Sequence, residues 1–369
     1  MVIFNNQAFF VWYFLYFSSM KILLTARSTL YTQPGGDTIQ ITQTAHYLKK
    51  LGLEVDVKCA GEPIDHELYD VVHFFNLSRP QDILPHLNRI KKLVITSIYI
   101  DYRLPSIFYK SAKQRWLYRA LSLHGAEYVK ILGRWLTGNE VSPGLRYILR
   151  GQKRSIKKVL LKASHMITAS QFEQQKIEAH FGTSLPQLHQ VNLGTEHMPK
   201  VQESPYRKGV LCVGRFEALK NQLSLIKAQN KSGFPLTLVG QAATNQPDYL
   251  DACKKEASTE VQFAPFTQGE ELASLFSKAK VHALCSFYET TGLVTLEALK
   301  NGCQVVVARG SAPEEIFKDH AHICDPASIP SISNAILSAM NDTRDHTAWV
   351  EQNFSWEKAA HQLLKIYQQ

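Results

Sequence analysis

Two glutamates, Glu289 and Glu297, stand eight positions apart in the segment VHALCSFYETTGLVTLEALKNGCQVVVA. The segment predicts a strand, a loop, a helix and a second strand, with Glu289 in the loop and Glu297 inside the helix, roughly 9 Å along its axis. One carboxylate could then bind sugar hydroxyls and the other ribose hydroxyls, on either side of a bound diphosphate. Pairing of Glu297 with a surface lysine is the alternative, which the apolar run GLVTLEAL disfavours.

The start of this helix predicts the diphosphate site itself. We expect the helix to open at Gly292, with Thr290 or Thr291 as its N-cap. The backbone N–H groups of Gly292, Leu293 and Val294 would have no partner inside the helix and would point into the cleft. Because a helix N-terminus favours anions, Thr291 and these three residues are candidate donor-binding residues.

Two cations, Arg215 and Lys220, flank a loop that follows the strand-like run VLCVG, which ends at Gly214. Both could neutralise a diphosphate, Arg as a planar fork and Lys as a compact charge. A nucleoside diphosphate gains charge as it leaves, so fixed cations would stabilise the transition state most. The string is weak alone, but the two glutamates that follow make it specific. Arg215, Lys220 and Glu289 are the catalytic candidates, and Gly214 joins Glu297 among the donor-binding ones.

Short apolar runs alternate with amphipathic stretches along most of the chain, which predicts parallel sheets covered by helices on both faces. The alternation begins at KILLTA, pauses after QVNLG and restarts at GVLCVGRF. We therefore expect an α/β protein with two doubly wound, Rossmann-like domains over residues 20–200 and 201–350, and a last segment over 351–369. Ligands bind such sheets beyond the carboxyl ends of the strands, where the candidate residues lie.

Composition limits the classes of function. The chain has 369 residues, a net charge of +9 and six scattered cysteines without a C-x-x-C pair. These cysteines are typical of reduced core residues in a cytoplasmic protein, and the 14 histidines show no metal-ligand spacing, so no metal site is expected. Residues 1–19 hold an apolar run about half a membrane span long. We interpret them as a non-structural extension, with a membrane-surface anchor as the alternative.

Seven basic residues and no acidic residue lie between Arg146 and Lys162. A solvated helix face is one interpretation, and contact with an anionic membrane surface or an anionic acceptor is the other. The charge would also suit nucleic acid, but no known nucleic-acid-binding module is visible. We therefore expect no nucleic-acid partner.

Several motifs together resemble the retaining glycosyltransferases of the GT-B fold, family four. They are the pair Glu289 and Glu297, the segment from Gly214-Arg215 to Lys220-Asn221, the run Glu314-Glu315-Ile316 and the closing FSWEKAAHQLLKIY. The resemblance implies two domains that face a central cleft, a nucleotide-sugar donor in the second domain and a saccharide or lipid-linked acceptor in the first. It implies a final helix around Trp356 that crosses back to the first domain. It also implies a reaction that needs no metal or cofactor and retains the anomeric configuration by front-face attack.

The acceptor side carries weaker signals. Gly35 and Gly36 follow the first strand in QPGGD, where they match the family's glycine loop or form a plain turn. Relatives often carry a His-Asp pair where this chain has Tyr99-Ile100-Asp101-Tyr102, so Asp101 keeps its place and the histidine's role is unfilled. His73 in VVHFF is expected to be a packed strand residue.

The resemblance favours an enzyme of cell-surface polysaccharide or lipopolysaccharide assembly, at the cytoplasmic face of a membrane. A phosphorylase or a nucleotide-sugar epimerase of the same fold is one alternative. A non-catalytic, basic protein that binds polyanions is another. The intact pair Glu289 and Glu297 favours the transferase.

Overall fold

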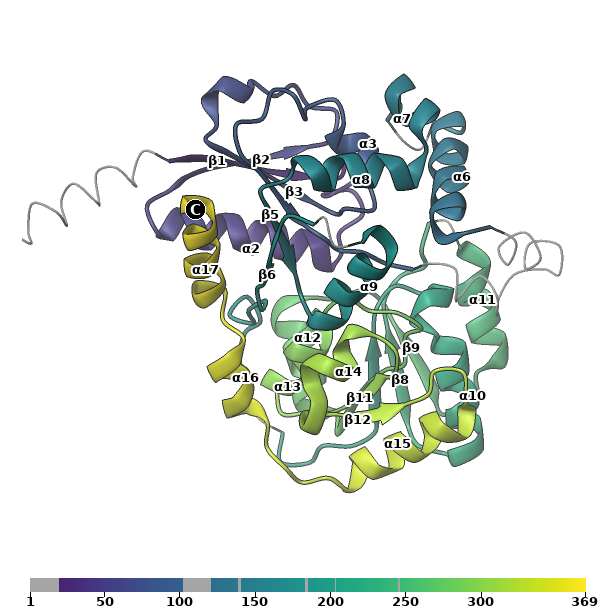
Figure 1. Ribbon diagram of the computed structural model, residues 1–369. Helices are drawn as coiled ribbons and strands as arrows, with labels where there is room; N and C mark the ends of the chain where they lie inside the picture. The colour runs from purple at the N-terminus through teal and green to yellow at the C-terminus, as the bar shows by residue number, and fades with distance from the viewer. Residues whose placement is uncertain (1–19, 102–120, 139–140, 183–184, 203, 245) are drawn as a thin grey trace, which may run out of the picture.

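The computed structural model describes residues 20–101, 121–138, 141–182, 185–202, 204–244 and 246–369. They form two α/β domains, one above the other in Figure 1. Each domain holds a six-stranded sheet whose paired strands are all parallel. The predicted α/β architecture of two doubly wound domains is confirmed.

The first sheet has the strand order β2-β1-β3-β4-β5-β6. Its strands are β1 (Lys21–Ala26), β2 (Glu54–Cys59), β3 (Val71–Phe75), β4 (Leu93–Thr96), β5 (His165–Thr168) and β6 (Gln187–Gln190). Its helices are α2 (Gly36–Lys50), α3 (Pro80–Ile83), α6 (Leu123–Leu136), α7 (Gly144–Arg150), α8 (Gln152–Lys162) and α9 (Gln171–Phe181), with a 3-10 turn over His66–Leu68.

Alternation along β1 explains why helices cover both faces of this sheet. Ile22 and Leu24 point to one side, into a core shared with α2, while Leu23 points to the other, into a core with Ile156 and Val159 of α8. All are buried. The period of two residues therefore fixes which helix lies on which face.

The second sheet has the order β12-β11-β10-β7-β8-β9. Its strands are β7 (Val210–Val213), β8 (Leu236–Val239), β9 (Val261–Ala264), β10 (Val281–Leu284), β11 (Gln304–Ala308) and β12 (His322–Cys324). Its helices are α10 (Gln222–Ser232), α11 (Pro247–Glu256), α12 (Gly269–Lys278), α13 (Leu293–Lys300), α14 (Ala312–Phe317) and α15 (Ile329–Asn341), with 3-10 turns over Ala218–Lys220 and Lys318–His320. The strand order reverses between β7 and β10, and a crevice at such a switch point is where doubly wound sheets bind ligands.

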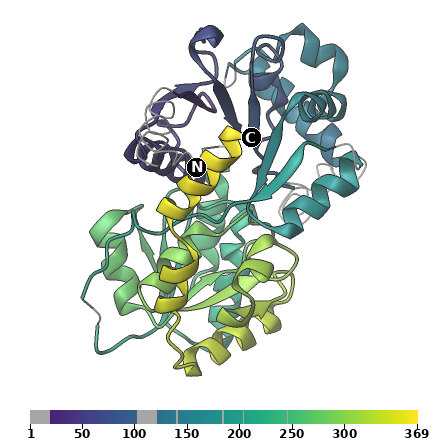
Figure 2. The same ribbon diagram turned by 60° about the vertical axis from the view of Figure 1, so that its left-hand side comes forward.

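The end of the chain joins the two domains. After α16 (Thr347–Asn353), helix α17 (Trp356–Gln368) leaves the second domain and packs against α2 of the first, as the yellow helix in Figure 2 shows. Near its end, the Tyr367 hydroxyl lies 2.7 Å from His73 Nδ1, and the Tyr367 carbonyl accepts from Lys92 Nζ at 2.8 Å.

His73 is a packed strand residue, as expected. It is fully buried on β3, and its second ring nitrogen, Nε2, lies 2.8 Å from Thr96 Oγ1. Burial lowers the pKa of this imidazole to about 3, because an interior position disfavours the charged form. His73 is therefore a neutral part of the α17 docking site.

Candidate active site

The loops after β7 and β10 meet at the switch point of the second sheet. Lys220, at the end of the 3-10 turn after β7, places Nζ 2.5 Å from Oε1 of Glu289, in the loop after β10. Both side chains are largely buried, with 18% and 13% of their surface exposed. Two of the three catalytic candidates are therefore in direct contact.

The third catalytic candidate, Arg215, is more exposed. Its guanidinium Nη2 lies 3.4 Å from Oε1 of Glu217, and 42% of its side chain is open to solvent. Its carbonyl accepts a hydrogen bond from Gln222 Nε2 at 2.8 Å, which fixes the backbone just after Gly214. The guanidinium is therefore more open to solvent than the Lys220 ammonium.

Asn221, in the loop after β7, connects this loop to the loops after β10 and β12. The sequence did not reveal this role. Its backbone is left-handed, with φ 59°, a conformation that asparagine adopts more readily than most residues. Its buried Nδ2 donates to the carbonyls of Cys285 and Pro326 at 3.0 and 2.8 Å. The ends of β7, β10 and β12 are thereby locked relative to one another.

Helix α13 begins differently from the prediction. Gly292 is the N-cap, no side chain caps the helix, and the helical residues start at Leu293, so the expected Thr290 or Thr291 cap is wrong. Gly292 adopts φ 71°, and a Cβ there would lie 3.3 Å from Pro313 Cγ. Because this left-handed residue is itself the N-cap, neither threonine occupies the N-cap position. Within the described residues, the N–H groups of Gly292, Leu293 and Val294 have no hydrogen-bond partner.

Glu297 lies in the second turn of α13 and is buried, with 5% of its side chain exposed. Within the described residues it forms no ion pair with a lysine. Its Oε1 lies 2.8 Å from Nε2 of His197, in the segment between β6 and β7 that joins the two domains. The second nitrogen of His197, Nδ1, accepts from the indole Nε1 of Trp356 at 3.1 Å. The sequence signal for this chain of contacts was only the apolar setting of Glu297.

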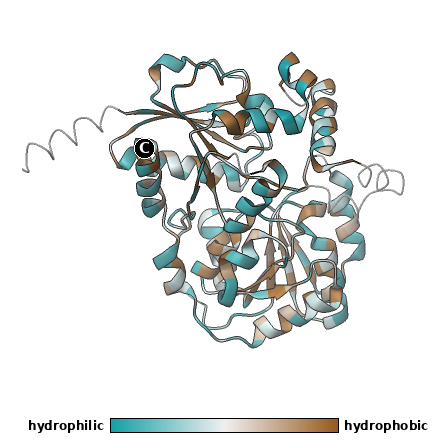
Figure 3. Ribbon diagram, in the orientation of Figure 1, coloured by the Kyte–Doolittle hydropathy of each residue, from teal (hydrophilic) through white to brown (hydrophobic). Residues whose placement is uncertain are grey.

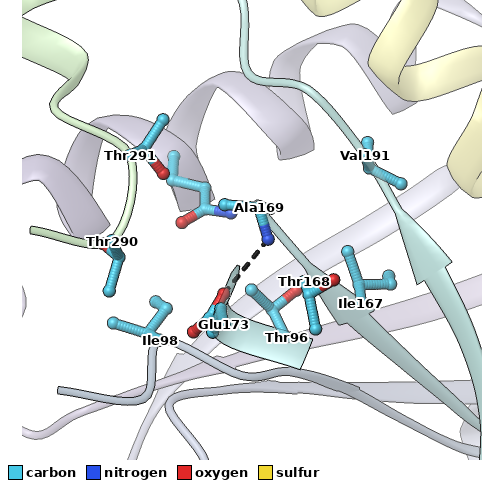
Figure 4. A pocket seen from close by; sticks show the side chains of 10 residues that line it. Thr96, Ile98, Ile167, Thr168, Ala169, Glu173, Val191, Thr290 and Thr291 are labelled. Atoms are coloured by element: carbon cyan, nitrogen blue, oxygen red, sulfur yellow. Dashed lines mark hydrogen bonds between the residues drawn. The ribbon is translucent and has the colours of Figure 1, made fainter. Parts of the chain in front are cut away.

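A small pocket lies between the domains (Figure 4). Thr290 and Thr291, just before α13, line one side, and Gln40, Thr96 and Thr168 of the first domain line the other. Within the described residues, the buried Thr168 Oγ1 has no hydrogen-bond partner. The pocket therefore offers hydroxyl and amide groups beside the donor loop.

Glu173 also lines this pocket (Figure 4). Its carboxylate accepts from the backbone N–H groups of Tyr99 and Ala169 at 2.7 and 3.1 Å. Burial raises the pKa of Glu173, and these N–H donors act in the opposite direction. The carboxylate is occupied in holding the loop after β4, which carries Asp101.

The first-domain candidates Gly35 and Gly36 form the start of α2, where Gly35 is the N-cap. Beside them Arg27 pairs with Asp37, Nε to Oδ2, at 2.5 Å. Asp101 is the last described residue before the gap at 102–120, and Tyr102 lies outside the described residues. The helix that begins at the glycines reaches the pocket through Gln40.

Two contacts close the domains around the site. The Tyr288 hydroxyl donates to the Tyr99 carbonyl at 2.8 Å. Glu315 of α14 accepts from the N–H groups of Gln171 and Phe172 at 2.9 and 2.6 Å, and so caps the N-terminus of α9 from the other domain. This role of Glu315 depends on a contact across 144 residues, which sequence spacing could not indicate.

Neither a metal centre nor a membrane span is found in the part of the chain that the structure describes. No group of three or more His, Cys, Asp or Glu side chains there could hold a metal ion. No helix among the described residues combines the length and apolarity needed to cross a bilayer.

Comparison with known proteins places the second domain in a family. Residues 195–362 match the family model "Glycosyl transferases group 1". The chain is 24% identical to the O-antigen chain mannosyltransferase B of Escherichia coli over 249 residues, which are 59% of this chain and 64% of that protein. It is 24% identical to a D-inositol 3-phosphate glycosyltransferase of Corynebacterium aurimucosum over 388 aligned positions, 90% of each chain. The chain thus carries a group 1 glycosyl transferase domain.

Solved structures share the two-domain arrangement. Sucrose-phosphate synthase from Thermosynechococcus elongatus superimposes with a TM-score of 0.70 at 16% identity, over 95% of this chain and 98% of that one. Anabaena HepE in complex with UDP and glucose gives 0.68 at 17% identity, over 95% and 99%. The fold is therefore GT-B, as expected. The alignments with the first two curated relatives span 64% and 53% of those proteins.

Proposed function

We propose that this protein transfers a sugar from a nucleoside diphosphate sugar to an acceptor hydroxyl. The observation that carries the proposal is the contact of Lys220 with Glu289 at the switch point of the second sheet. Glu289 lies just before the N–H groups that open α13, which have no partner among the described residues. A diphosphate fits that helix end, since its charge suits both the N–H groups and the cations. The group 1 domain supports the same assignment.

In this proposal Arg215 and Lys220 stabilise the leaving nucleoside diphosphate. Lys220 is held by Glu289 and stays beside the helix end, while the half-exposed Arg215 turns in when the donor binds. Charge on the diphosphate grows as the glycosidic bond breaks, so these cations act mainly on the transition state. They would supply the charge that a metal ion supplies in other transferases, which makes the reaction metal-independent.

The two glutamates act on the donor in different ways. Glu289 receives hydroxyls of the transferred sugar, and Glu297 receives ribose hydroxyls. Glu289 is paired with Lys220, and in this proposal it binds and orients the donor and does not act as a general acid. Retention of configuration follows if the acceptor attacks from the face the diphosphate leaves, with a diphosphate oxygen taking the acceptor proton.

The acceptor would lie in the pocket between the domains, where Gln40, Thr96 and Thr168 face the donor loop. These neutral side chains suit the hydroxyls of a saccharide or of a lipid-linked saccharide. The O-antigen chain mannosyltransferase among the relatives supports a place in cell-surface polysaccharide or lipopolysaccharide synthesis.

The experiment is a turnover assay with a panel of nucleoside diphosphate sugars, an oligosaccharide acceptor mixture and EDTA. The proposal expects nucleoside diphosphate release that depends on acceptor, and a product whose anomeric proton coupling matches the donor. Release of sugar 1-phosphate would instead identify a phosphorylase. No turnover, together with salt-dependent polyanion binding, would identify the non-catalytic alternative.

A second part of the proposal concerns a membrane surface formed by the end of α6, α7 and α8. Leu136, Leu145, Leu149 and Leu161 expose between 64% and 84% of their surface, and Figure 3 shows brown, apolar segments along α6 and α7. Exposed basic residues surround them on the same helices: Arg146, Lys153, Arg154, Lys157, Lys158 and Lys162. Exposed leucines among lysines are the composition of a helix that lies on an anionic bilayer.

This surface is tested by sedimentation with vesicles of phosphatidylcholine alone or with 30% phosphatidylglycerol, the latter fraction set roughly to the charge of a cytoplasmic leaflet. The double variant Leu145→Ser and Leu149→Ser should release the protein from anionic vesicles, whereas Leu68→Ser, an exposed leucine elsewhere, should not. If wild-type protein stays in the supernatant with both vesicles, the basic run is a solvated face.

A further inference from the structure

The segment between the domains is hydrogen-bonded to α13 at two positions. His197 Nε2 lies 2.8 Å from Glu297 Oε1, and one turn later Lys300 Nζ donates to the carbonyls of Thr195 and Met198, each at 2.7 Å. The helix that opens at the proposed diphosphate site is therefore anchored by residues outside its own sheet. Of these anchors, only His197 touches a side chain proposed to bind the donor.

The same segment is fixed to the start of α17. Glu196 accepts from Ser355 Oγ at 2.6 Å and from the backbone N–H of Trp356 at 2.9 Å. Gly194 allows this close approach, because a Cβ there would collide with the backbone nitrogen of Trp356. The ring of His197 is thus held between α13 and α17, with 12% of its side chain exposed.

The contact with Trp356 decides which nitrogen of His197 carries the proton. An indole N–H can only donate, so Nδ1 of His197, 3.1 Å away, must offer its lone pair. The proton then sits on Nε2 and is donated to Glu297 Oε1. The remaining lone pairs of the Glu297 carboxylate stay available to other donors, and the hydrogen bond from His197 helps to fix the orientation of the carboxylate.

We infer that His197 is a positioning residue for the donor: it fixes the Glu297 carboxylate so that the free lone pairs meet the two hydroxyls of the nucleotide ribose. The inference rests on the proposed function, since it assigns Glu297 to the ribose. Trp356 acts one step further out, by fixing the tautomer of His197. The expected ligand group is therefore a vicinal diol, and the diphosphate itself is bound elsewhere, by the N–H groups of α13.

The test compares three probes by calorimetry: whichever of UDP, GDP and ADP binds the wild-type protein, its 2′,3′-dideoxy form, and inorganic pyrophosphate. His197→Ala should weaken the ribonucleotide about tenfold, the worth of one charge-assisted hydrogen bond, and leave the other two probes unchanged. His197→Gln keeps a side-chain N–H near the position of Nε2 and should stay within about threefold of wild type. His361→Ala, an exposed histidine of α17, is the matched control.

The outcomes distinguish the proposed function from the role of His197. If wild-type protein binds no nucleoside diphosphate, the proposed function fails. If it binds the ribonucleotide more tightly than the dideoxy form but His197→Ala leaves that preference intact, only the role of His197 is overturned. An equal loss for all three probes would mean that His197 merely supports the fold, and unchanged pyrophosphate affinity shows that the variant is folded.

Discussion

Lys220 and Glu289 are 69 residues apart in sequence and in contact in the structure, Nζ to Oε1 at 2.5 Å. The contact joins the two loops that flank the switch point of the second sheet, directly before α13. The ion pair fixes the two side chains relative to each other, and Glu289 lies only a few residues before the start of α13. The contribution of Lys220 to donor binding can be measured.

Replacing Lys220 by Met should remove the compact charge beside the diphosphate. Nucleoside diphosphate affinity should fall about tenfold, and kcat should fall further, because the leaving group carries most charge in the transition state. Titration calorimetry and steady-state kinetics on the same variant check this. Lys231→Met, an exposed lysine at the end of α10, is the control with the same change in charge. Equal kinetics for the two variants would remove Lys220 from the site.

We expect the variants Asn221→Gly and Asn221→Ala to be destabilised to different extents. Asn221→Gly keeps the left-handed backbone but leaves the carbonyls of Cys285 and Pro326 without their donor, at a cost of about 1–3 kcal/mol. Asn221→Ala adds about 1 kcal/mol, since alanine resists positive φ. Urea unfolding of both variants measures the order, and an alanine variant as stable as the glycine variant would contradict it.

Glu315 should hold the domains closed. Its carboxylate caps α9 across the interface, so Glu315→Ala leaves two N–H groups of Gln171 and Phe172 unpaired and weakens closure by about 1 kcal/mol. We expect a larger radius of gyration in X-ray scattering. Glu270→Ala, an exposed glutamate of α12, should scatter as wild type does. Identical curves for the two variants would show that other contacts suffice.

Because His73 is buried, we expect the free energy of unfolding to fall at acid pH. The pKa of His73 is about 3 in the fold, and about 6.5 in an unfolded chain, so the unfolded state binds more protons between those values. Stability present above pH 6.5 is therefore lost as the pH falls towards 3, by up to about 1.4 kcal/mol per pH unit. His73→Asn should flatten the slope of unfolding free energy against pH. An unchanged slope would assign the effect to other histidines, such as the half-buried His86 and the buried His282, whose pKa values are also lowered by burial.

Much of the fold could be predicted because it depends on local patterns. Alternating residues of β1 specify the two faces of a sheet, and the restart of the pattern before β7 marks the second domain. The neighbourhood of Lys220 and Glu289 follows from the switch-point rule, since both residues stand just after strands that become neighbours.

The contacts that depend on long-range packing could not be predicted. His197 meets Glu297, and Glu315 meets α9, only because α17 and the closed interface bring the domains together. The predicted threonine cap of α13 was wrong because Thr290 and Thr291 resemble ordinary N-cap residues. The residue that crowds Gly292, Pro313, belongs to another helix and could not be recognised from the local sequence. Local propensity decides such positions only when nothing distant competes.

The central claim is that α13 and its flanking loops bind a nucleoside diphosphate without metal, and calorimetry with UDP, GDP, ADP and CMP in EDTA tests it most directly. We expect one diphosphate to bind in the micromolar range, Glu297→Ala to lose about tenfold or more, and Glu256→Ala, an exposed glutamate of α11, to bind as wild type does. Binding of none of the four, or equal binding by Glu297→Ala, would contradict the account.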